Sequence, residues 1–100
     1  MKVVWSPLAL DRVREHASFI ERDNPSAARD WVNDLFDAAE ALASFPTSGR
    51  VVPEVGRADI RELIHDGYRI IYRIETDQVA VLTVRHSRQQ LPPDEIDEGE

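Results

Sequence analysis

The chain has 100 residues, no cysteine and a formal net charge of −7. This length fits one small globular domain, and the lack of cysteine excludes disulfides and thiolate metal sites. The N-terminal run MKVVW is too short for a signal peptide and no apolar stretch reaches transmembrane length, so we expect a cytoplasmic protein without a membrane partner.

The first half of the sequence predicts a strand followed by two helices. After a short β-type run, Ser6 offers an N-cap with Pro7 at the first helical position, and apolar residues recur at helical spacing until about Arg22. The stretch 23–25 ends this helix and starts a second one, which we expect to reach about Ala43. Because the connection is so short, the two helices should pack as an antiparallel hairpin.

A long connection follows at residues 46–60, with prolines, glycines and no helical period. A connection of this length inside a compact domain is often functional or ordered by a partner. Its apolar residues Val51, Val52 and Val55 either tuck under the edge of a sheet, which is the interpretation we favour, or remain available to a partner.

Residues 61–86 predict three consecutive antiparallel strands. Asp66-Gly67 is typical of a two-residue hairpin turn, because both positions of that turn need positive φ. A second turn is expected around Thr76-Asp77. The predicted fold class is therefore α+β, in the order β-α-α-β-β-β, with the helical hairpin packed on one face of a small, mainly antiparallel four-stranded sheet.

Side-chain alternation sorts the residues of these strands onto two faces. The predicted register pairs Leu63 with Ile70 and Ile70 with Thr83. One face is apolar enough to form the core under the helices. The other face mixes an apolar strip with basic residues and resembles a docking groove; its members are Ile64, Arg69, Ile71, Arg73, Leu82, Val84 and His86.

The charge is unevenly divided along the chain. Five acids lie in the last seven residues, and eleven of the twelve basic residues are arginines. Arginine suits contacts to carboxylates, to phosphates and to protein interfaces, whereas a domain for bulk nucleic-acid binding is normally basic overall. The three histidines fit no recognised metal motif, and we expect neither a metal nor a cofactor.

The acidic C-terminus predicts a disordered tail. Its composition places a single domain at residues 1–88 and the tail at 89–100. A sharper hypothesis is that the carboxylates of the tail fold back on Arg69, Arg73 and Arg88.

The stretches FPTSGRVVPEVG, RELIHDGYRIIYRI and VLTVRHSR resemble the RelE/ParE superfamily of toxins from bacterial type II toxin–antitoxin modules. The resemblance covers roughly Val3 to Arg88. It implies a toxin neutralised by a cognate antitoxin, which would wrap it with an amphipathic helix and an extended segment in a toxin–antitoxin hetero-oligomer. The groove residues above, together with Arg88, are the candidates for antitoxin or target contact.

Two branches of this superfamily imply different targets. ParE-like members inhibit DNA gyrase by protein–protein binding, whereas RelE-like members are metal-independent, ribosome-dependent mRNA endonucleases. For the ribonuclease alternative, the base, the acid and the cations would come from Glu54, Arg69, His86 and Arg88.

We favour the ParE-like branch and assign no catalytic residue. Arg69 matches the superfamily's arginine on the central strand, but Glu62 stands where a cation is expected, and a carboxylate there opposes a phosphate. Whether the protein is an enzyme is left open, and a non-toxic binding homologue is a further alternative.

Overall fold

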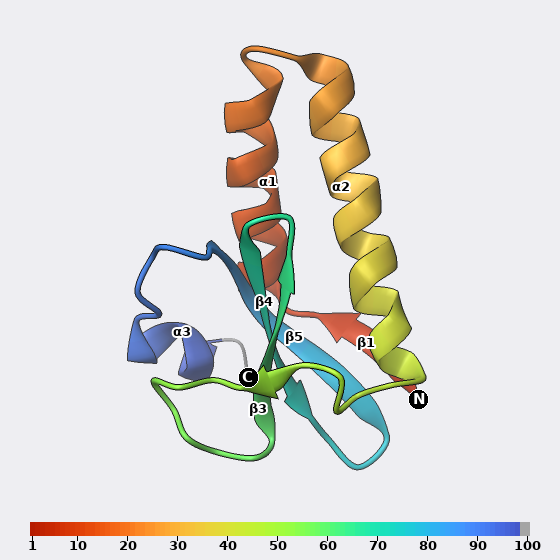
Figure 1. Ribbon diagram of the computed structural model, residues 1–100, viewed down its shortest axis with the longest axis vertical. Helices are drawn as coiled ribbons and strands as arrows, with labels where there is room; N and C mark the ends of the chain where they lie inside the picture. Colours follow the sequence, from red (N-terminus) through yellow and green to blue (C-terminus); the bar gives the residue numbers. More distant parts are fainter. Residues whose placement is uncertain (99–100) are drawn as a thin grey trace.

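The computed structural model describes residues 1–98, and the side chains of residues 1–96 (Figure 1). Its elements are β1 (Lys2–Trp5), α1 (Pro7–Glu21), α2 (Pro25–Glu40), the 3₁₀ turn η1 (Ala41–Ala43), β2 (Arg50–Val51), β3 (Ile60–His65), β4 (Tyr68–Ile74), β5 (Gln78–His86) and α3 (Pro93–Glu98). The strands form one sheet in the order β1-β5-β4-β3-β2. None of the helices among these residues is long and apolar enough to cross a membrane.

The α+β fold is confirmed, with five strands instead of the predicted four. The additional strand arises because Arg50 and Val51 of the long connection pair with Glu62 and Arg61. β1 runs parallel to β5, while the other strand pairs are antiparallel.

Side-chain caps start both helices of the hairpin. The Ser6 Oγ accepts a hydrogen bond from the Ala9 amide at 3.0 Å, and the Asn24 Oδ1 accepts one from the Ala27 amide at 3.1 Å. A proline opens each helix, where its missing N–H costs nothing. The helices stand side by side, and their connection extends well beyond the sheet (Figure 1). The predicted hairpin is therefore confirmed, with α2 ending at Glu40 and passing into η1.

The hairpin covers one face of the sheet. The buried residues of this main core are Ala9, Val13, Trp31, Leu35, Ala39, Leu42, Ile70, Tyr72, Val79, Val81 and Val84. The Tyr72 hydroxyl also donates to the Pro46 carbonyl at 2.6 Å and accepts from the Gly49 amide at 3.0 Å. These two hydrogen bonds fix the start of the long connection against the sheet.

The first hairpin turn has the predicted geometry, with φ of 50° at Asp66 and 81° at Gly67. The register that it sets, with Leu63 opposite Ile70, is also confirmed. In the second hairpin the register shifts between Ile71 and Tyr72, so Ile70 pairs with Val84 instead of Thr83. A β-bulge of this kind inserts one extra residue into a strand and reverses the alternation beyond it.

The bulge overturns the predicted faces of two residues. Val84 is buried in the main core, and His86 lies opposite Tyr68, whose ring packs against α1 and α2, so neither belongs to the predicted groove. In their place, Thr83 and Arg85 turn to the face opposite the hairpin, which we call the outer face.

The outer face has its own apolar cluster. It consists of Val52, Ile60, Ile71, Leu82, Leu91 and Ile96. The favoured position for Val52, under the sheet edge, is thus confirmed. The structure differs from the expected disordered tail, because Leu91 and Ile96 are buried to 5 % and 7 % exposure and Pro93–Glu98 is helical. Residues 99 and 100 lie outside the described part of the chain.

Candidate interaction surface

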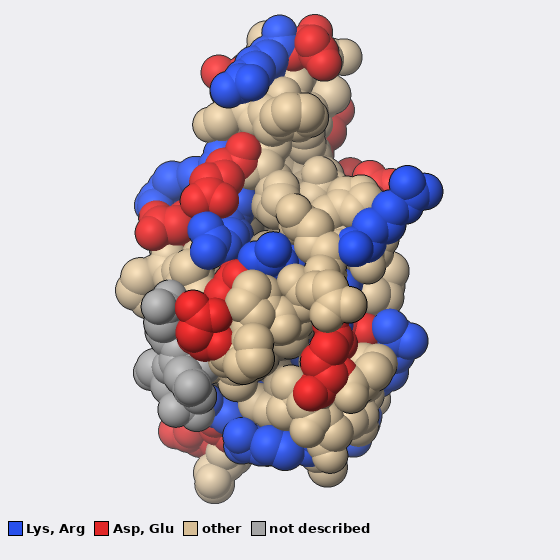
Figure 2. Space-filling view, turned by 90° about the vertical axis from the view of Figure 1, so that its left-hand side faces the viewer, with Lys and Arg blue, Asp and Glu red and all other residues tan. Residues whose placement is uncertain are grey.

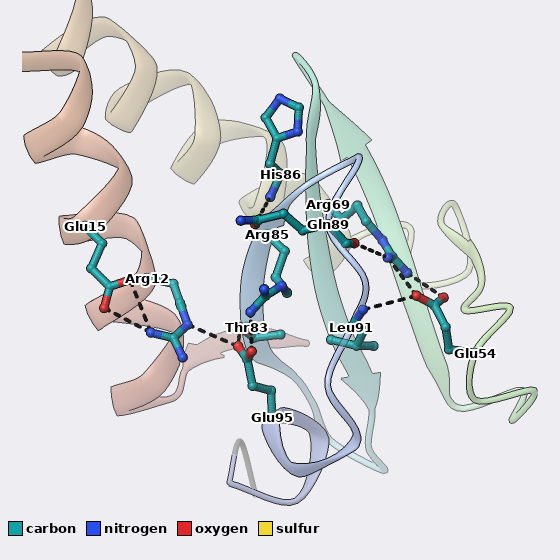
Figure 3. A network of polar contacts seen from close by, with 10 residues as sticks. All are labelled: Arg12, Glu15, Glu54, Arg69, Thr83, Arg85, His86, Gln89, Leu91 and Glu95. Atoms are coloured by element: carbon teal, nitrogen blue, oxygen red, sulfur yellow. Dashed lines mark hydrogen bonds and ion pairs between the residues drawn. The ribbon is translucent and has the colours of Figure 1, made fainter.

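Arg69 is the centre of a buried ion-pair network on the outer face (Figure 3). It lies on β4 and is 6 % exposed. Its Nε donates to Glu62 Oε1 at 2.6 Å, and its Nη1 and Nη2 donate to the two oxygens of Glu54 at 2.9 and 2.8 Å. Nη1 also donates to the Gln89 carbonyl at 3.2 Å. The guanidinium is therefore occupied by groups of its own chain.

The contacts of Glu62 explain why β3 carries a carboxylate at this position. Its side chain is fully buried and bridges two arginines, accepting from Arg69 and, at 2.5 Å, from Arg50 Nε. A buried carboxylate needs such partners, because desolvation otherwise penalises its charged form. Glu62 thus neutralises Arg69 in the folded protein.

Glu54 completes the network from the long connection. The hydrogen bond from Arg69 lowers the pKa of Glu54 from its usual value to about 2. One of its oxygens also accepts from the Leu91 amide at 3.3 Å. Glu54 therefore links the connection, the centre of the sheet and the C-terminal segment, and at neutral pH it is ionised.

A second polar cluster holds α3 on the outer face (Figure 3). The carboxylate of Glu95, 3 % exposed, accepts from Arg12 Nε at 3.1 Å, from Thr83 Oγ1 at 2.7 Å and from Arg85 Nη1. Burial acts to raise the pKa of Glu95, but hydrogen bonds from Thr83 and Arg12 outweigh it and hold the pKa below its usual value. Arg12 also pairs with Glu15 at 2.9 Å.

Sequence reasoning missed this second cluster. The sequence patterns do not single out Arg12, Thr83 or Arg85, and the acidic composition of the C-terminus assigns Glu95 to a disordered tail. The bulge in β5 is what brings Thr83 and Arg85 to the outer face, and neither glycine nor proline marks it in the sequence. The sequence signal that was available is the pair Leu91 and Ile96, two aliphatic residues inside an acidic segment.

The predicted groove is not an open surface. Ile71 and Leu82 do lie on the outer face, but they are fully buried beneath the C-terminal segment and the long connection. Arg73 is paired with Glu75, whose Oε2 lies 3.0 Å from its Nε. Two of the predicted candidates remain accessible: Ile64, at 49 % exposure, and the exposed Arg88.

The ribonuclease candidates separate into two groups. Glu54 and Arg69 form one ion pair, whereas His86 packs edge-on against Tyr68 with ring centroids 5.5 Å apart. The ring of His86 lies well apart from the Arg69–Glu54 pair in Figure 3. The Arg88 amide donates to His86 Nδ1 at 3.2 Å. The structure thus does not bring the four residues together around one point.

His86 instead belongs to an aromatic cluster beside the helices. Tyr68 lies 5.0 Å from His16 of α1 and 4.9 Å from Trp31 of α2, measured between ring centroids. Burial lowers the pKa of His16. The described residues include no group of three or more His, Cys, Asp or Glu side chains that could hold a metal ion.

Charges of both signs cover the side of the molecule next to α1 and α3. Figure 2 shows basic and acidic side chains lying next to one another there, with uncharged residues between them, and no continuous basic patch. A hollow of about 330 Å³ lies between the long connection and the C-terminal segment, lined by Glu54, Val55, Arg57, Leu91, Pro93 and Ile96.

The fold and the outer face define a small α+β domain whose central arginines are neutralised internally, and its relatives identify the class. Residues 3–91 match the family model described as "ParE toxin of type II toxin-antitoxin system, parDE". The chain belongs to this family and is a ParE-like toxin of a toxin–antitoxin module.

Two known proteins agree with this assignment. The chain is 42 % identical over 94 residues to "Putative toxin Y4kP" of Sinorhizobium fredii (strain NBRC 101917 / NGR234), covering 91 % of this chain and 93 % of that protein. It also superposes on a solved structure titled "Chromosomal ParDE TA system from P. aeruginosa", with a TM-score of 0.74 over 86 % of this chain and 95 % of that one. At 16 % identity, this second likeness shows the fold alone.

Proposed function

We propose that this toxin inhibits bacterial growth by binding DNA gyrase through protein contacts, and that a cognate antitoxin neutralises it in a hetero-oligomer. The choice of target rests on the environment of Arg69, which is the one clear match to the ribonuclease positions of the superfamily. Its guanidinium donates to Glu62, to Glu54 and to the Gln89 carbonyl of its own chain, and the residue is 6 % exposed. We also propose a cytoplasmic location, because DNA gyrase acts in the cytoplasm.

The chemistry of the other ribonuclease candidates also supports this choice. A general base works best with a pKa near the operating pH, and a carboxylate with a pKa of about 2 is too weak a base for a 2′-hydroxyl. A histidine on the helix side of the sheet does not supply the missing base to the Arg69 side. We therefore propose a toxin that acts by binding instead of by catalysis.

The open edge of β3 supports an antitoxin contact. Among the described residues, β2 pairs only with Arg61 and Glu62, so the end of β3 from Leu63 to His65 has no strand beside it on that edge. The exposed Ile64 lies on this stretch. An extended segment of the antitoxin can add to such an edge by main-chain hydrogen bonds and cover Ile64.

The test compares two activities of the purified toxin. We expect it to block supercoiling by gyrase, or to stabilise the gyrase–DNA cleavage complex, and to leave messenger RNA intact in a ribosome-dependent cleavage assay. Unimpaired gyrase with cleaved transcripts would replace the proposal by the ribonuclease alternative. If His86→Ala then abolished cleavage, the histidine would be implicated directly.

A growth assay separates both toxins from a non-toxic homologue. Induced expression in a bacterial host should stop growth, and co-expression of the small protein encoded by the neighbouring gene should restore it. Ile64→Asp should weaken that rescue, because it puts a charge on the proposed contact without disturbing a buried residue. Normal growth on induction of the toxin alone would contradict the proposal.

A further inference from the structure

Residues 89–98 lie across the outer face of the sheet, and we call them the C-terminal strap. Two aliphatic side chains and one carboxylate anchor the strap: Leu91 and Ile96 join the cluster of Ile71 and Leu82, and Glu95 enters the pocket between α1 and β5. The strap therefore covers the apolar residues that would otherwise form an exposed patch.

The backbone of the strap is tied to the rest of the domain by few hydrogen bonds. α3 has six residues, and a helix this short is not stable by itself in water. Pro92 and Pro93 have no amide to donate. The Leu91 amide reaches Glu54, and the Gln89 carbonyl accepts from Arg69, but no strand pairing involves the strap. Side chains hold it in place, so it can leave without breaking the sheet.

The pocket around Glu95 is incompletely satisfied by the strap. Glu95 accepts from Nη1 of Arg85, while Arg85 Nε is buried and has no hydrogen-bond partner within the described part of the chain. A buried donor without an acceptor is unfavourable, and guanidinium binds a carboxylate best through two parallel N–H groups. A carboxylate that also reaches Nε would bind this pocket better than Glu95 does.

We propose that the strap is a displaceable internal ligand, and that the outer face beneath it is a docking site for an acidic, aliphatic segment of the antitoxin. The matching segment carries a carboxylate for Arg12, Thr83 and Arg85, with aliphatic side chains on either side that replace Leu91 and Ile96. The identity of the partner rests on the proposed function; the docking site itself rests on the contacts above.

The test uses the full chain and a peptide as the probe. The peptide has the sequence of residues 89–100 and is titrated into isotope-labelled protein to millimolar concentration, with amide chemical shifts as the readout. The wild type is compared with Ile96→Ser, which weakens the strap, and with Asp94→Asn as a matched control, because Asp94 is an exposed residue of the same helix.

We expect the peptide to shift amides of residues 80–85 and 52–60, and to bind Ile96→Ser about tenfold more tightly than either the wild type or Asp94→Asn. Replacing the peptide's counterpart of Glu95 by glutamine should weaken binding about tenfold. A second variant, Glu95→Gln in the protein, should also bind the peptide more tightly than the wild type and guards against a folding defect caused by Ile96→Ser.

Two results would overturn the proposal. One is equal affinity for the wild type and both strap variants while their spectra show an intact sheet. The other is dimerisation of the strap variants in light scattering, which would make a second copy of this chain the occupant. Neither result depends on toxicity, so a failure here and a failure of the gyrase assay can be told apart.

Discussion

Glu62 on β3 and Arg69 on β4 form a diagonal ion pair across adjacent strands, 2.6 Å apart between Oε1 and Nε, and both side chains are almost fully buried. Removing one member of a buried pair leaves the other charge without compensation, which costs more than the pair itself contributes. This ion pair ties β3 to β4 on the outer face, beside the apolar cluster that the long connection and the C-terminal segment cover.

We expect Glu62→Gln to destabilise the protein by about 3 kcal/mol, since Arg69 and Arg50 would lose the carboxylate that neutralises them. Urea unfolding followed by circular dichroism measures the change. Glu40→Gln, the same substitution at an exposed position on α2, should change stability by less than about 0.5 kcal/mol. Equal effects of the two substitutions would show that the buried pair is not needed.

The low pKa of Glu54 makes the free energy of unfolding depend on pH in the acidic range. Its folded pKa of about 2 lies below the usual 4.5, so the unfolded chain binds more protons in this range. The stabilisation is fully present above pH 4.5 and is lost as the pH falls towards 2. Glu54→Gln should therefore unfold with a shallower dependence on pH between 4.5 and 2 than the wild type, as measured by urea titrations at several pH values. Identical slopes would contradict the ion pair.

Burial of His16 predicts a second pH dependence, nearer to neutrality. In the folded protein the pKa of His16 lies below the usual 6.5, so the unfolded chain takes up the proton first as the pH falls. The free energy of unfolding is therefore undiminished by His16 above pH 6.5 and decreases as the pH falls below that value. Proton chemical shifts of the His16 ring should give a midpoint below 6.5, and His16→Gln should flatten the loss of stability between pH 7 and 5. A midpoint above 6.5 would mean that the folded protein favours the charged form of the ring, which would contradict the prediction.

Gly49 allows the long connection to approach the sheet. A Cβ at this position would lie 2.5 Å from the Glu62 carbonyl oxygen and 2.6 Å from the Tyr72 hydroxyl, and the backbone atom cannot move aside cheaply. We expect Gly49→Ala to cost about 2 kcal/mol, within the range for overpacking a buried position. Ser48→Ala, at the exposed neighbouring position, is the control. Thermal unfolding of the two variants measures the difference, and equal unfolding midpoints would contradict this prediction.

The parts of the fold that depend on local chemistry could be predicted from the sequence. Ser6 and Asn24 cap helices because their side chains can accept an amide hydrogen bond, and Asp66-Gly67 turns because both residues tolerate positive φ. The bulge beside Leu82 could not be predicted, because it is decided by how β5 fits two cores at once. That single insertion changed the faces of Val84 and His86, and with them part of the candidate site.

The C-terminal strap was missed for a different reason. An acidic composition is typical of solvated tails, and the arginines that receive Glu95 come from α1 and from the strand beyond the bulge. Arg12 lies 83 residues away in sequence from its partner. Contacts between residues so far apart in the sequence depend on how the sheet assembles, so local sequence patterns do not predict them.

The parallel pairing of β1 with β5 has a consequence for the order in which the domain folds. Lys2 pairs with Gln78 and Trp5 with Val81, so β1 has no neighbour in the sheet until β5, the last strand in the described part of the chain, is in place. Closing so long a loop is slow compared with forming the helical hairpin. The helical hairpin can therefore form early, whereas the sheet, and with it the outer face that carries the ion-pair network, is completed only when β1 and β5 meet.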